Sequence, residues 1–340
     1  MGSATHEVAA SSALLTVRDL SKHFVLSTPW LRRLLPHQAP PVLKAVDGVT
    51  FEIKRGQTFA LVGESGCGKT TVARVIVGLH VPTSGEIVFE GRDVPRGADR
   101  SARGERTRMQ MIFQDPYASL DPRWRVRDII AEPIRTFRLA ASRSDLTERV
   151  SELLRQVGLS LEDGEKFPHE FSGGQRQRIS IARALSSSPD FIVCDEPTSA
   201  LDVSVQAQIL NLMKELQARL HLTYLFISHN LAVVHHVSDQ VGVMYLGRLC
   251  EVAPKGALFR RPRHPYTRVL LDTIPDLNLS GRRRQPVTGE VPNPLHPPSG
   301  CAFHPRCPSA YDRCRIETPN PRPCGDGVVA CHAVEEGRLQ

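Results

Sequence analysis

The segment GESGCGKTT, which directly follows the apolar run TFALV, contains the residue types that bind phosphate. Gly63, Gly68, Lys69 and Thr70 fit the spacing G-x-x-x-x-G-K-[ST] of a phosphate-binding loop. Glycines let successive backbone N–H groups turn toward phosphate oxygens, because no side chains stand in the way. Lys69 would reach the terminal phosphates of a nucleotide, and the Thr70 hydroxyl would complete the shell of a Mg²⁺ ion. The expected nucleotide contacts in this loop are Gly63, Ser65, Gly66, Cys67, Gly68, Lys69, Thr70 and Thr71.

Two later segments place acidic and imidazole groups at the ends of apolar runs. FIVCDEPTSALD ends its apolar run in Asp195 and Glu196, and TYLFISHN delivers His229 to the same edge of the expected sheet. Asp195 would hold the Mg²⁺ opposite Thr70, directly or through water. Glu196 would polarise a water molecule for in-line attack on a γ-phosphate. The alternatives are an acidic pair that merely closes a strand and a structural histidine.

The segment FSGGQRQRISIARAL predicts a second helix N-terminus that accepts an anion. Ser172 and Gln175 have the spacing of a capping box, so Ser172 is expected to cap the helix that follows. Gly173 and Gly174 would let the backbone approach a ligand closely. The chain therefore has two phosphate-seeking sites, and the residues alone do not say whether both face one nucleotide.

The elements that must position these residues follow from the hydrophobic periodicity. Val72, Val75, Ile76 and Leu79 recur at helical spacing and predict a helix that opens at the phosphate-binding loop. Buried strands alternating with helical segments predict an α/β sheet with helices on its faces. Strands are expected at residues 14–26, 46–53, 58–63, 191–196 and 223–228, a hairpin at 85–94, and helices within 125–185 and at 204–220.

The composition bounds the class of protein. The 340 residues are 41% hydrophobic and 23% charged, which excludes wholesale disorder. The net charge of +7 is the ordinary state of an arginine-rich protein, and we expect no nucleic-acid partner. No apolar run approaches the length that spans a bilayer, and the N-terminus lacks the layout of a secretory signal. We therefore expect a cytosolic chain whose membrane part, if any, is another polypeptide.

Five of the eight cysteines lie in the last forty residues. In a reducing compartment such crowding favours metal binding over disulfides. Four thiolates suffice for a tetrahedral zinc or for a [4Fe–4S] cluster, although zinc sites usually contain close C-x2–4-C pairs and none occurs here. Free thiols are the third alternative. The spacing is Cys301-x5-Cys307-x6-Cys314-x9-Cys324-x6-Cys331.

Taken together, the motifs resemble those of the ATP-binding subunit of an ABC transporter. They are the Walker A loop GESGCGKTT, the Q-loop MIFQDP with Gln114, the signature FSGGQ, Walker B FIVCDE, the D-loop SALD with Asp202, and the H-loop residue His229. Their order and approximate spacings agree over roughly residues 14–260. The resemblance implies a P-loop NTPase core of the ABC ATPase type, with a helical subdomain at about residues 115–185.

The resemblance also implies how the two phosphate-seeking sites are used. Two such subunits would pack head to tail, with each ATP between the Walker A loop of one and the signature of the other. Phe24 would stack on adenine, with an ordinary core residue of a strand as the alternative. Gln114 would sense the Mg²⁺ and the attacking water. The residues implied to serve the partner's ATP are Ser172, Gly173, Gly174, Gln175 and Asp202.

The C-terminal part narrows the resemblance to oligopeptide and dipeptide importer ATPases. It contains HPYTRVLLDTIP, GEVPNPLHPPSGCAFHPRCPSAYDRC and VVACH, and the insertion after LSKHF with QDPYASLDPR is most similar to the second ATPase subunit. Residues 1–260 would form the ATP-binding domain and residues 261–340 a small Cys-rich extension. The resemblance implies a [4Fe–4S] cluster on Cys301, Cys307, Cys314 and Cys331, with Cys324 spare. The basic segment 30–41 receives no role.

The leading hypothesis is therefore an Mg²⁺-dependent ATPase subunit that powers import of oligopeptides or dipeptides. Its implied partners are a second ATPase subunit, identical or related, two transmembrane permease subunits and, indirectly, an extracytoplasmic peptide-binding protein. It would lie on the cytoplasmic face of the cell membrane. The alternatives are the same role for nickel or another small solute, and a soluble ABC ATPase outside transport. An inactive regulatory subunit is disfavoured because Lys69, Asp195, Glu196 and His229 are all present.

Overall fold

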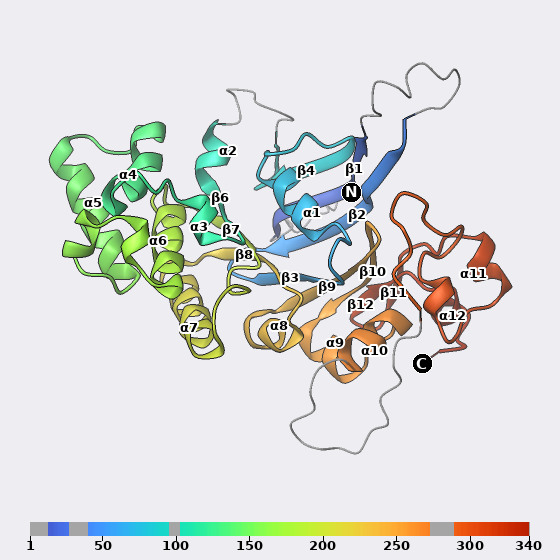
Figure 1. Ribbon diagram of the computed structural model, residues 1–340. Coiled ribbons are helices and arrows are strands. Elements are labelled where there is room, and N and C mark those ends of the chain that lie inside the picture. Colours follow the sequence, from blue (N-terminus) through green and yellow to red (C-terminus); the bar gives the residue numbers. More distant parts are fainter. Residues whose placement is uncertain (1–12, 27–39, 95–102, 273–288, 340) are drawn as a thin grey trace, which may run out of the picture.

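A computed structural model describes residues 13–26, 40–94, 103–272 and 289–339 (Figure 1). The segment after LSKHF lies largely outside the described residues, as does much of the proline- and arginine-rich passage before the cysteines. Within the described part, two sheets and a group of helices surround the predicted loop. No helix there combines the length and apolar character needed to cross a membrane.

The larger sheet has the strand order β11-β12-β10-β9-β3-β8-β7-β6. Its central strands are parallel, as the buried apolar runs predicted. Such strands are apolar along their whole length because both faces of a parallel sheet are covered. The parallel part consists of β3 (Thr58–Val62), β6 (Met109–Ile112), β7 (Phe191–Asp195), β8 (Thr223–Ile227) and β9 (Gln240–Tyr245). β10 (Arg248–Pro254) runs antiparallel to β9.

The smaller sheet is antiparallel and packs over the first helix and β3. Its strands are β1 (Ala13–Val25), β2 (Val42–Lys54), β4 (Ser84–Phe89) and β5 (Arg92–Asp93), in the order β2-β1-β4-β5. The predicted hairpin at 85–94 is confirmed as β4 and β5. Phe51 of β2 stacks on Phe59 of β3 with ring centroids 4.7 Å apart, which ties the two sheets together.

The helix after the loop, α1 (Lys69–Ile76), is shorter than the apolar spacing predicted. Val72, Val75 and Ile76 are buried as expected, but Leu79 lies beyond the helix and is 55% exposed. Gly78 explains the early end, because it adopts a left-handed conformation with φ of 78°. The N–H of Leu79 then turns back to the carbonyl of Arg74.

Residues 125–185 are largely helical, as predicted, and form a layer beside the sheet edge at β6 (Figure 1). α4 (Val126–Phe137), α5 (Arg143–Gln156) and α6 (Gly173–Leu185) share one apolar core with α7 (Val203–Leu220). Two short 3-10 helices, η3 (Glu162–Glu165) and η4 (Pro168–Glu170), lie between α5 and α6. Before α4 come α2 (Arg103–Arg108), which precedes β6, and α3 (Pro116–Ser119).

The C-terminal region folds against the far edge of the larger sheet (Figure 1). β12 (Gly327–Val329) pairs with β10, and β11 (Arg322–Cys324) pairs with β12. An aromatic cluster joins the end of β9 to the C-terminal region, and it consists of the buried rings of Tyr245, Tyr266 and Phe303. The remaining elements are α8 (Leu231–Val237), α9 (Lys255–Arg260), α10 (Pro265–Asp272), η5 (His304–Arg306), α11 (Asp312–Ile316) and α12 (His332–Glu335).

The neutral imidazole of His264 makes this region sensitive to acid. It is 2% exposed, accepts the N–H of Tyr266 at Nδ1, and hydrogen-bonds the backbone of Ala330. Burial lowers the pKa of His264 from 6.5 to about 4. Between these values the unfolded chain binds a proton that the folded protein does not, so stability falls as the pH falls.

We therefore expect the free energy of unfolding to lose about 3 kcal/mol through His264 as the pH falls across that window. Urea unfolding across the window measures the change. His264→Gln should be less stable at neutral pH because it loses a buried hydrogen bond, but its stability should fall less steeply with acid. An identical pH dependence in the two proteins would contradict this role for His264.

Candidate functional site

The predicted phosphate-binding loop joins β3 to α1, and its lysine lies within it. Lys69 is 5% exposed, and its Nζ donates to the carbonyl oxygens of Gly63 at 2.8 Å and Glu64 at 3.0 Å. Gly68 caps α1 with a φ of 109°. The start of α1 therefore presents backbone N–H groups and an ammonium group at one place, which favours an anion.

The loop requires glycine at both ends because other backbone segments pass against it. A Cβ on Gly63 would lie 2.1 Å from the carbonyl oxygen of Met244, and one on Gly68 would lie 2.1 Å from that of Ala45. Gly66 has nothing within 4 Å of such a Cβ, although its φ of 78° is also positive. Close packing fixes the first two glycines, whereas only the backbone conformation favours the third.

Gly68→Ala should therefore lower the free energy of unfolding by about 3 kcal/mol, because strain and a backbone clash add together. Gly66→Ala is the matched control and should cost about 1 kcal/mol, since it meets strain alone. Urea denaturation of both variants checks the difference. Equal destabilisation would show that the contact with Ala45 does not restrict the loop.

Thr70 and Asp195 meet as the sequence predicted. The Thr70 hydroxyl donates to Oδ1 of Asp195 at 3.0 Å, and Asp195 is 2% exposed at the end of β7. Burial raises the pKa of the Asp195 carboxyl, while the Thr70 hydrogen bond opposes that rise. A hydroxyl and a carboxylate are the hard oxygen ligands that Mg²⁺ prefers, so the donor set fits this ion.

Glu196 lies within hydrogen-bond distance of two other predicted residues, Gln114 and His229. Its Oε2 accepts a hydrogen bond from Nε2 of Gln114 at 3.3 Å and lies 3.1 Å from Nδ1 of His229. The Glu196 side chain is 17% exposed and the His229 side chain 59% exposed, so the group opens to solvent. The backbone of Glu196 has a φ of 47°, which is strained for a residue with a side chain. This arrangement can hold a water molecule and accept its proton.

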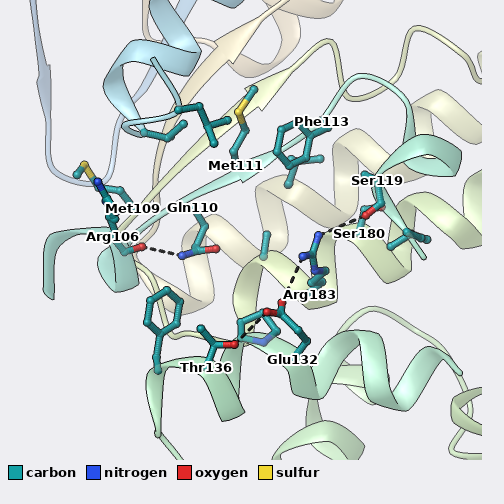
Figure 2. A pocket seen from close by; sticks show the side chains of 17 residues that line it. Arg106, Met109, Gln110, Met111, Phe113, Ser119, Glu132, Thr136, Ser180 and Arg183 are labelled. Carbon is teal, nitrogen blue, oxygen red and sulfur yellow. Dashed lines mark hydrogen bonds and ion pairs between the residues drawn. The ribbon is translucent and has the colours of Figure 1, made fainter. Parts of the chain in front are cut away.

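A cavity of about 250 Å³ lies between the sheet edge at β6, α4 and α6 (Figure 2). Arg183 of α6 contacts Glu132 of α4 at 3.3 Å and also donates to the carbonyl of Ser119. Phe113, the neighbour of Gln114, lines the same cavity. Gln114 therefore occupies the joint between the sheet and the helical layer.

The predicted capping box at α6 is confirmed. The N–H of Gln175 donates to Oγ of Ser172 at 3.3 Å, and Oε1 of Gln175 accepts the N–H of Ser172 at 3.0 Å. Ser172, Gly173 and Gln175 are exposed. Gly174 is buried, and a Cβ there would lie 2.4 Å from Cγ1 of Val205, so packing against α7 alone already requires glycine.

Two further predicted residues lie outside these groups. Asp202 is exposed and caps α7, because its Oδ1 accepts the N–H of Val205 at 2.9 Å. This backbone bond lowers the pKa of Asp202. Phe24 is half-buried in β1, edge-on to His80 at 5.5 Å, with Nζ of Lys22 4.9 Å from its ring centroid. One face of a partly exposed aromatic ring is suited to stacking.

The cysteine cluster predicted near the C-terminus finds less support. Burial raises the pKa of Cys301 to about 12 and that of Cys307 to about 11, with smaller contributions from Cys314 and Cys331. Among the described residues, no three or more His, Cys, Asp or Glu side chains are grouped so that they could hold a metal ion. Burial thus favours the protonated thiols of Cys301 and Cys307, and the predicted iron–sulfur cluster is not supported by the arrangement of its ligands.

Two contacts to the phosphate-binding loop were not predicted from the sequence. The hydroxyl of Tyr266 accepts the N–H of Glu64 at 3.0 Å. Arg306 donates to both carboxylate oxygens of Glu64, at 2.8 and 2.9 Å. Tyr266 and Arg306 follow Glu64 by 202 and 242 residues, and no spacing rule links residues so far apart. The only signal in the sequence is that the two residues lie in the segments HPY and HPR of the C-terminal part.

Known proteins resemble the chain over almost its full length. Residues 46–199 match the ABC transporter family, and residues 250–314 match the oligopeptide/dipeptide transporter C-terminal region. A probable peptide ABC transporter ATP-binding protein of Sinorhizobium fredii is 50% identical over 95% of this chain and 90% of its own length. The di/tripeptide transport ATP-binding protein DppF of Pseudomonas aeruginosa is 49% identical over 95% of this chain and 98% of its own.

Solved structures share the fold. CbiO1 of Clostridium perfringens, part of an ABC transporter complex, has a TM-score of 0.62 and 25% identity over 74% of this chain and 92% of its own. An ATP-binding cassette solved as a post-hydrolysis dimer with ADP and Pi has a TM-score of 0.61 and 25% identity over 71% of this chain and 98% of its own. With a phosphate-binding loop, a buried Asp195 and the Glu196 group in place, the chain belongs to the ABC transporter ATP-binding proteins and is an ABC ATPase of the oligopeptide/dipeptide transporter branch.

Proposed function

We propose that this chain hydrolyses ATP to power import of oligopeptides or dipeptides through a separate transmembrane permease. The observation that carries the peptide assignment is the match of residues 250–314 to the oligopeptide/dipeptide transporter C-terminal region. The peptide and di/tripeptide names of relatives near 50% identity agree with it. The catalytic part of the proposal rests on the Glu196 group.

In the proposed reaction Glu196 acts as general base. It accepts a proton from water as the water oxygen bonds to the γ-phosphorus, while the bond from that phosphorus to the ADP oxygen breaks. His229 and Gln114 hold the Glu196 carboxylate and the water in line. Lys69 contacts the terminal phosphates. A Mg²⁺ ion held by Thr70, Asp195 and Gln114 would neutralise charge that develops on those phosphates.

The signature residues are proposed to act on the ATP of a partner subunit. Ser172, Gly173 and Gln175 are exposed at the N-terminus of α6, in the helical layer rather than beside α1 (Figure 1). Asp202 is exposed at the start of α7. A head-to-tail dimer would bring these groups to the other subunit's phosphate-binding loop, with Phe24 stacked on adenine. The partner is a second copy or a related chain.

We further propose a division of the chain into two parts and a location for it at the membrane. Residues 1–260 would form the ATP-binding domain and residues 261–340 the extension, which docks on it through β12 and the aromatic cluster. The chain would lie on the cytoplasmic face of the membrane, bound to two permease subunits that receive peptides from an extracytoplasmic binding protein.

Transport assays on the source cells test the cargo. Deletion of the gene should abolish uptake of labelled di- and oligopeptides, and wild-type protein, but not Glu196→Gln, should restore it. Labelled Ni²⁺ uptake measured in the same cells distinguishes the alternative cargo. Intact peptide uptake with lost Ni²⁺ uptake would overturn the peptide assignment and leave the ATPase intact.

We further propose that Cys301, Cys307, Cys314 and Cys331 ligate a [4Fe–4S] cluster, with Cys324 spare. The support is the chemistry of four soft thiol donors, of which Cys307, Cys331 and Cys314 each help to raise the pKa of Cys301. Because no three or more of the described metal-binding side chains are grouped, these cysteines would have to move closer together to hold the cluster. Iron would displace their protons on binding.

Anaerobic purification should then yield about four irons and four sulfides per chain, with absorption near roughly 400 nm. Cys301→Ser should lose the iron, whereas Cys324→Ser should keep it as the matched control. One zinc per chain, or no metal, would remove the cluster without affecting the ATPase assignment.

A further inference from the structure

Glu64 connects the phosphate-binding loop to the C-terminal region through both its backbone and its side chain. Its N–H donates to the Tyr266 hydroxyl at 3.0 Å, and its carboxylate receives two bonds from Arg306. These partners come from α10 and η5, which follow β10 in the sequence. The loop is thus held from outside its own domain at the residue directly after Gly63.

The Arg306 contact is built as a buried, two-pronged ion pair. The Arg306 side chain is 5% exposed, and the Glu64 carboxylate is 25% exposed. The hydrogen bond to Glu64 raises the pKa of Arg306, so the guanidinium stays charged. Parallel N–H···O bonds fix the carboxylate in direction as well as distance. A shielded bidentate pair of this kind restrains its partners far more than an exposed one.

An aromatic cluster keeps the two partners in place. The Tyr245 ring lies 4.7 Å from Tyr266 and 5.3 Å from Phe303, and all three side chains are buried. The Arg306 guanidinium lies 5.9 Å from the ring centroids of both Tyr245 and Phe303, and also bonds the Tyr245 hydroxyl. Since Tyr245 ends β9 beside the loop, the cluster forms a rigid bridge from the sheet to the C-terminal region.

The bridge reaches the phosphate-binding lysine. The N–H that Tyr266 binds belongs to the Gly63–Glu64 peptide, and the carbonyl of that peptide, on Gly63, accepts Nζ of Lys69 at 2.8 Å. The carbonyl of Glu64, in the next peptide, accepts the same Nζ at 3.0 Å. A shift of Glu64 would therefore move both a loop carbonyl and Lys69. The path from η5 and α10 through Glu64 to Lys69 consists entirely of hydrogen bonds.

We propose that Arg306 and Tyr266 are positioning residues through which the C-terminal region sets the affinity of the loop for Mg-ATP. The inference rests on the proposed function, because it takes ATP as the occupant of the loop. Arg306 immediately precedes Cys307, so a conformational change of the cysteine segment would act on Glu64 through the Arg306 hydrogen bonds. The extension thereby acts on nucleotide binding and not on the chemical step.

The test compares Tyr266→Phe and Arg306→Gln with matched controls. Tyr224→Phe removes a buried hydroxyl that bonds the Met213 carbonyl, and Arg108→Gln removes an arginine paired with Asp190 and Glu90. Calorimetric Mg-ATP titration gives the Kd, steady-state ATPase assays give kcat and KM, and thermal melting gives the Tm. The ring shape is kept in Tyr266→Phe, so this variant decides the issue if Arg306→Gln does not fold.

We expect the Kd to rise about fivefold in Tyr266→Phe, the equivalent of one net hydrogen bond, and more than about tenfold in Arg306→Gln. The kcat at saturating ATP should stay within about twofold in both, because no group in contact with the reacting atoms has changed. The controls should keep the wild-type Kd whatever their Tm.

If the Kd for Mg-ATP is the same in Tyr266→Phe and Tyr224→Phe and only the Tm of Tyr266→Phe is lowered, the bridge stabilises the fold without setting the affinity. That result would overturn the inference. Wild-type protein that binds no Mg-ATP would instead defeat the proposed function. Because coupling is reciprocal, Mg-ATP should also slow hydrogen exchange in residues 301–314 of the wild type, and less so in Tyr266→Phe.

Discussion

Glu196→Gln is expected to bind Mg-ATP with wild-type affinity while its turnover falls by about 10²–10⁴-fold, the usual contribution of a general base. Glutamine keeps the size of the side chain and can still bond Gln114 and His229, so the geometry of the pocket survives. It cannot accept the proton of the attacking water. Binding and chemistry should therefore separate in this single variant.

Phosphate release measured at saturating Mg-ATP, together with a titration of nucleotide affinity, checks this expectation. Glu152→Gln is the matched control, because Glu152 lies on α5 and pairs with Arg155 at the surface. It should hydrolyse ATP as the wild type does. Turnover in Glu196→Gln within about threefold of wild type would remove Glu196 as the general base, since loss of that role costs at least about 10².

The same variant addresses the proposed dimer. If hydrolysis separates the subunits, a chain that binds ATP without cleaving it should accumulate as an ATP-dependent dimer in light scattering. Ser172→Ala in the same background should weaken that dimer, because it removes the cap of α6 that would face the partner's phosphates in the proposed dimer. Monomers at saturating ATP would contradict the proposed head-to-tail use of the signature.

Much of the site follows from local patterns, which is why the sequence predicts it. The phosphate-binding loop, the Ser172–Gln175 capping box and the strand ends that carry Asp195 and His229 each depend on residues within about eight positions. The contacts Thr70–Asp195 and Glu196–His229 then follow, because parallel strands deliver their ends to one edge. Their chemistry is encoded locally even though they lie far apart in the chain.

Other features escaped the sequence for identifiable reasons. β6 is only four residues long, which is too short for a hydrophobic period of two residues to be recognised in the sequence. Its position is set instead by its pairing with β7. Leu79 fits the apolar spacing of helix α1, but the helix itself ends before Gly78, which has a positive φ. The bonds from Tyr266 and Arg306 to Glu64 join distant segments that carry no shared motif.

Lys69→Ala is expected to weaken Mg-ATP binding by about 10- to 100-fold, because charged hydrogen bonds to phosphate contribute about 1.5–3 kcal/mol. The ammonium group is 5% exposed and held by the Gly63 and Glu64 carbonyls, so its loss also leaves two loop acceptors unpaired. The Tm should fall together with the affinity. Lys214→Ala, on an exposed position of α7, is the control and should change neither.

The two variants together separate the roles within one site. Lys69→Ala should fail at binding, so that raising the ATP concentration restores part of its turnover, whereas no ATP concentration should rescue Glu196→Gln. Calorimetric titration and hydrolysis rates over a range of Mg-ATP concentrations distinguish these behaviours. An unchanged ATP affinity in Lys69→Ala would mean that the ammonium group serves only the apo loop, and that the backbone N–H groups at the start of α1 hold the phosphates without it.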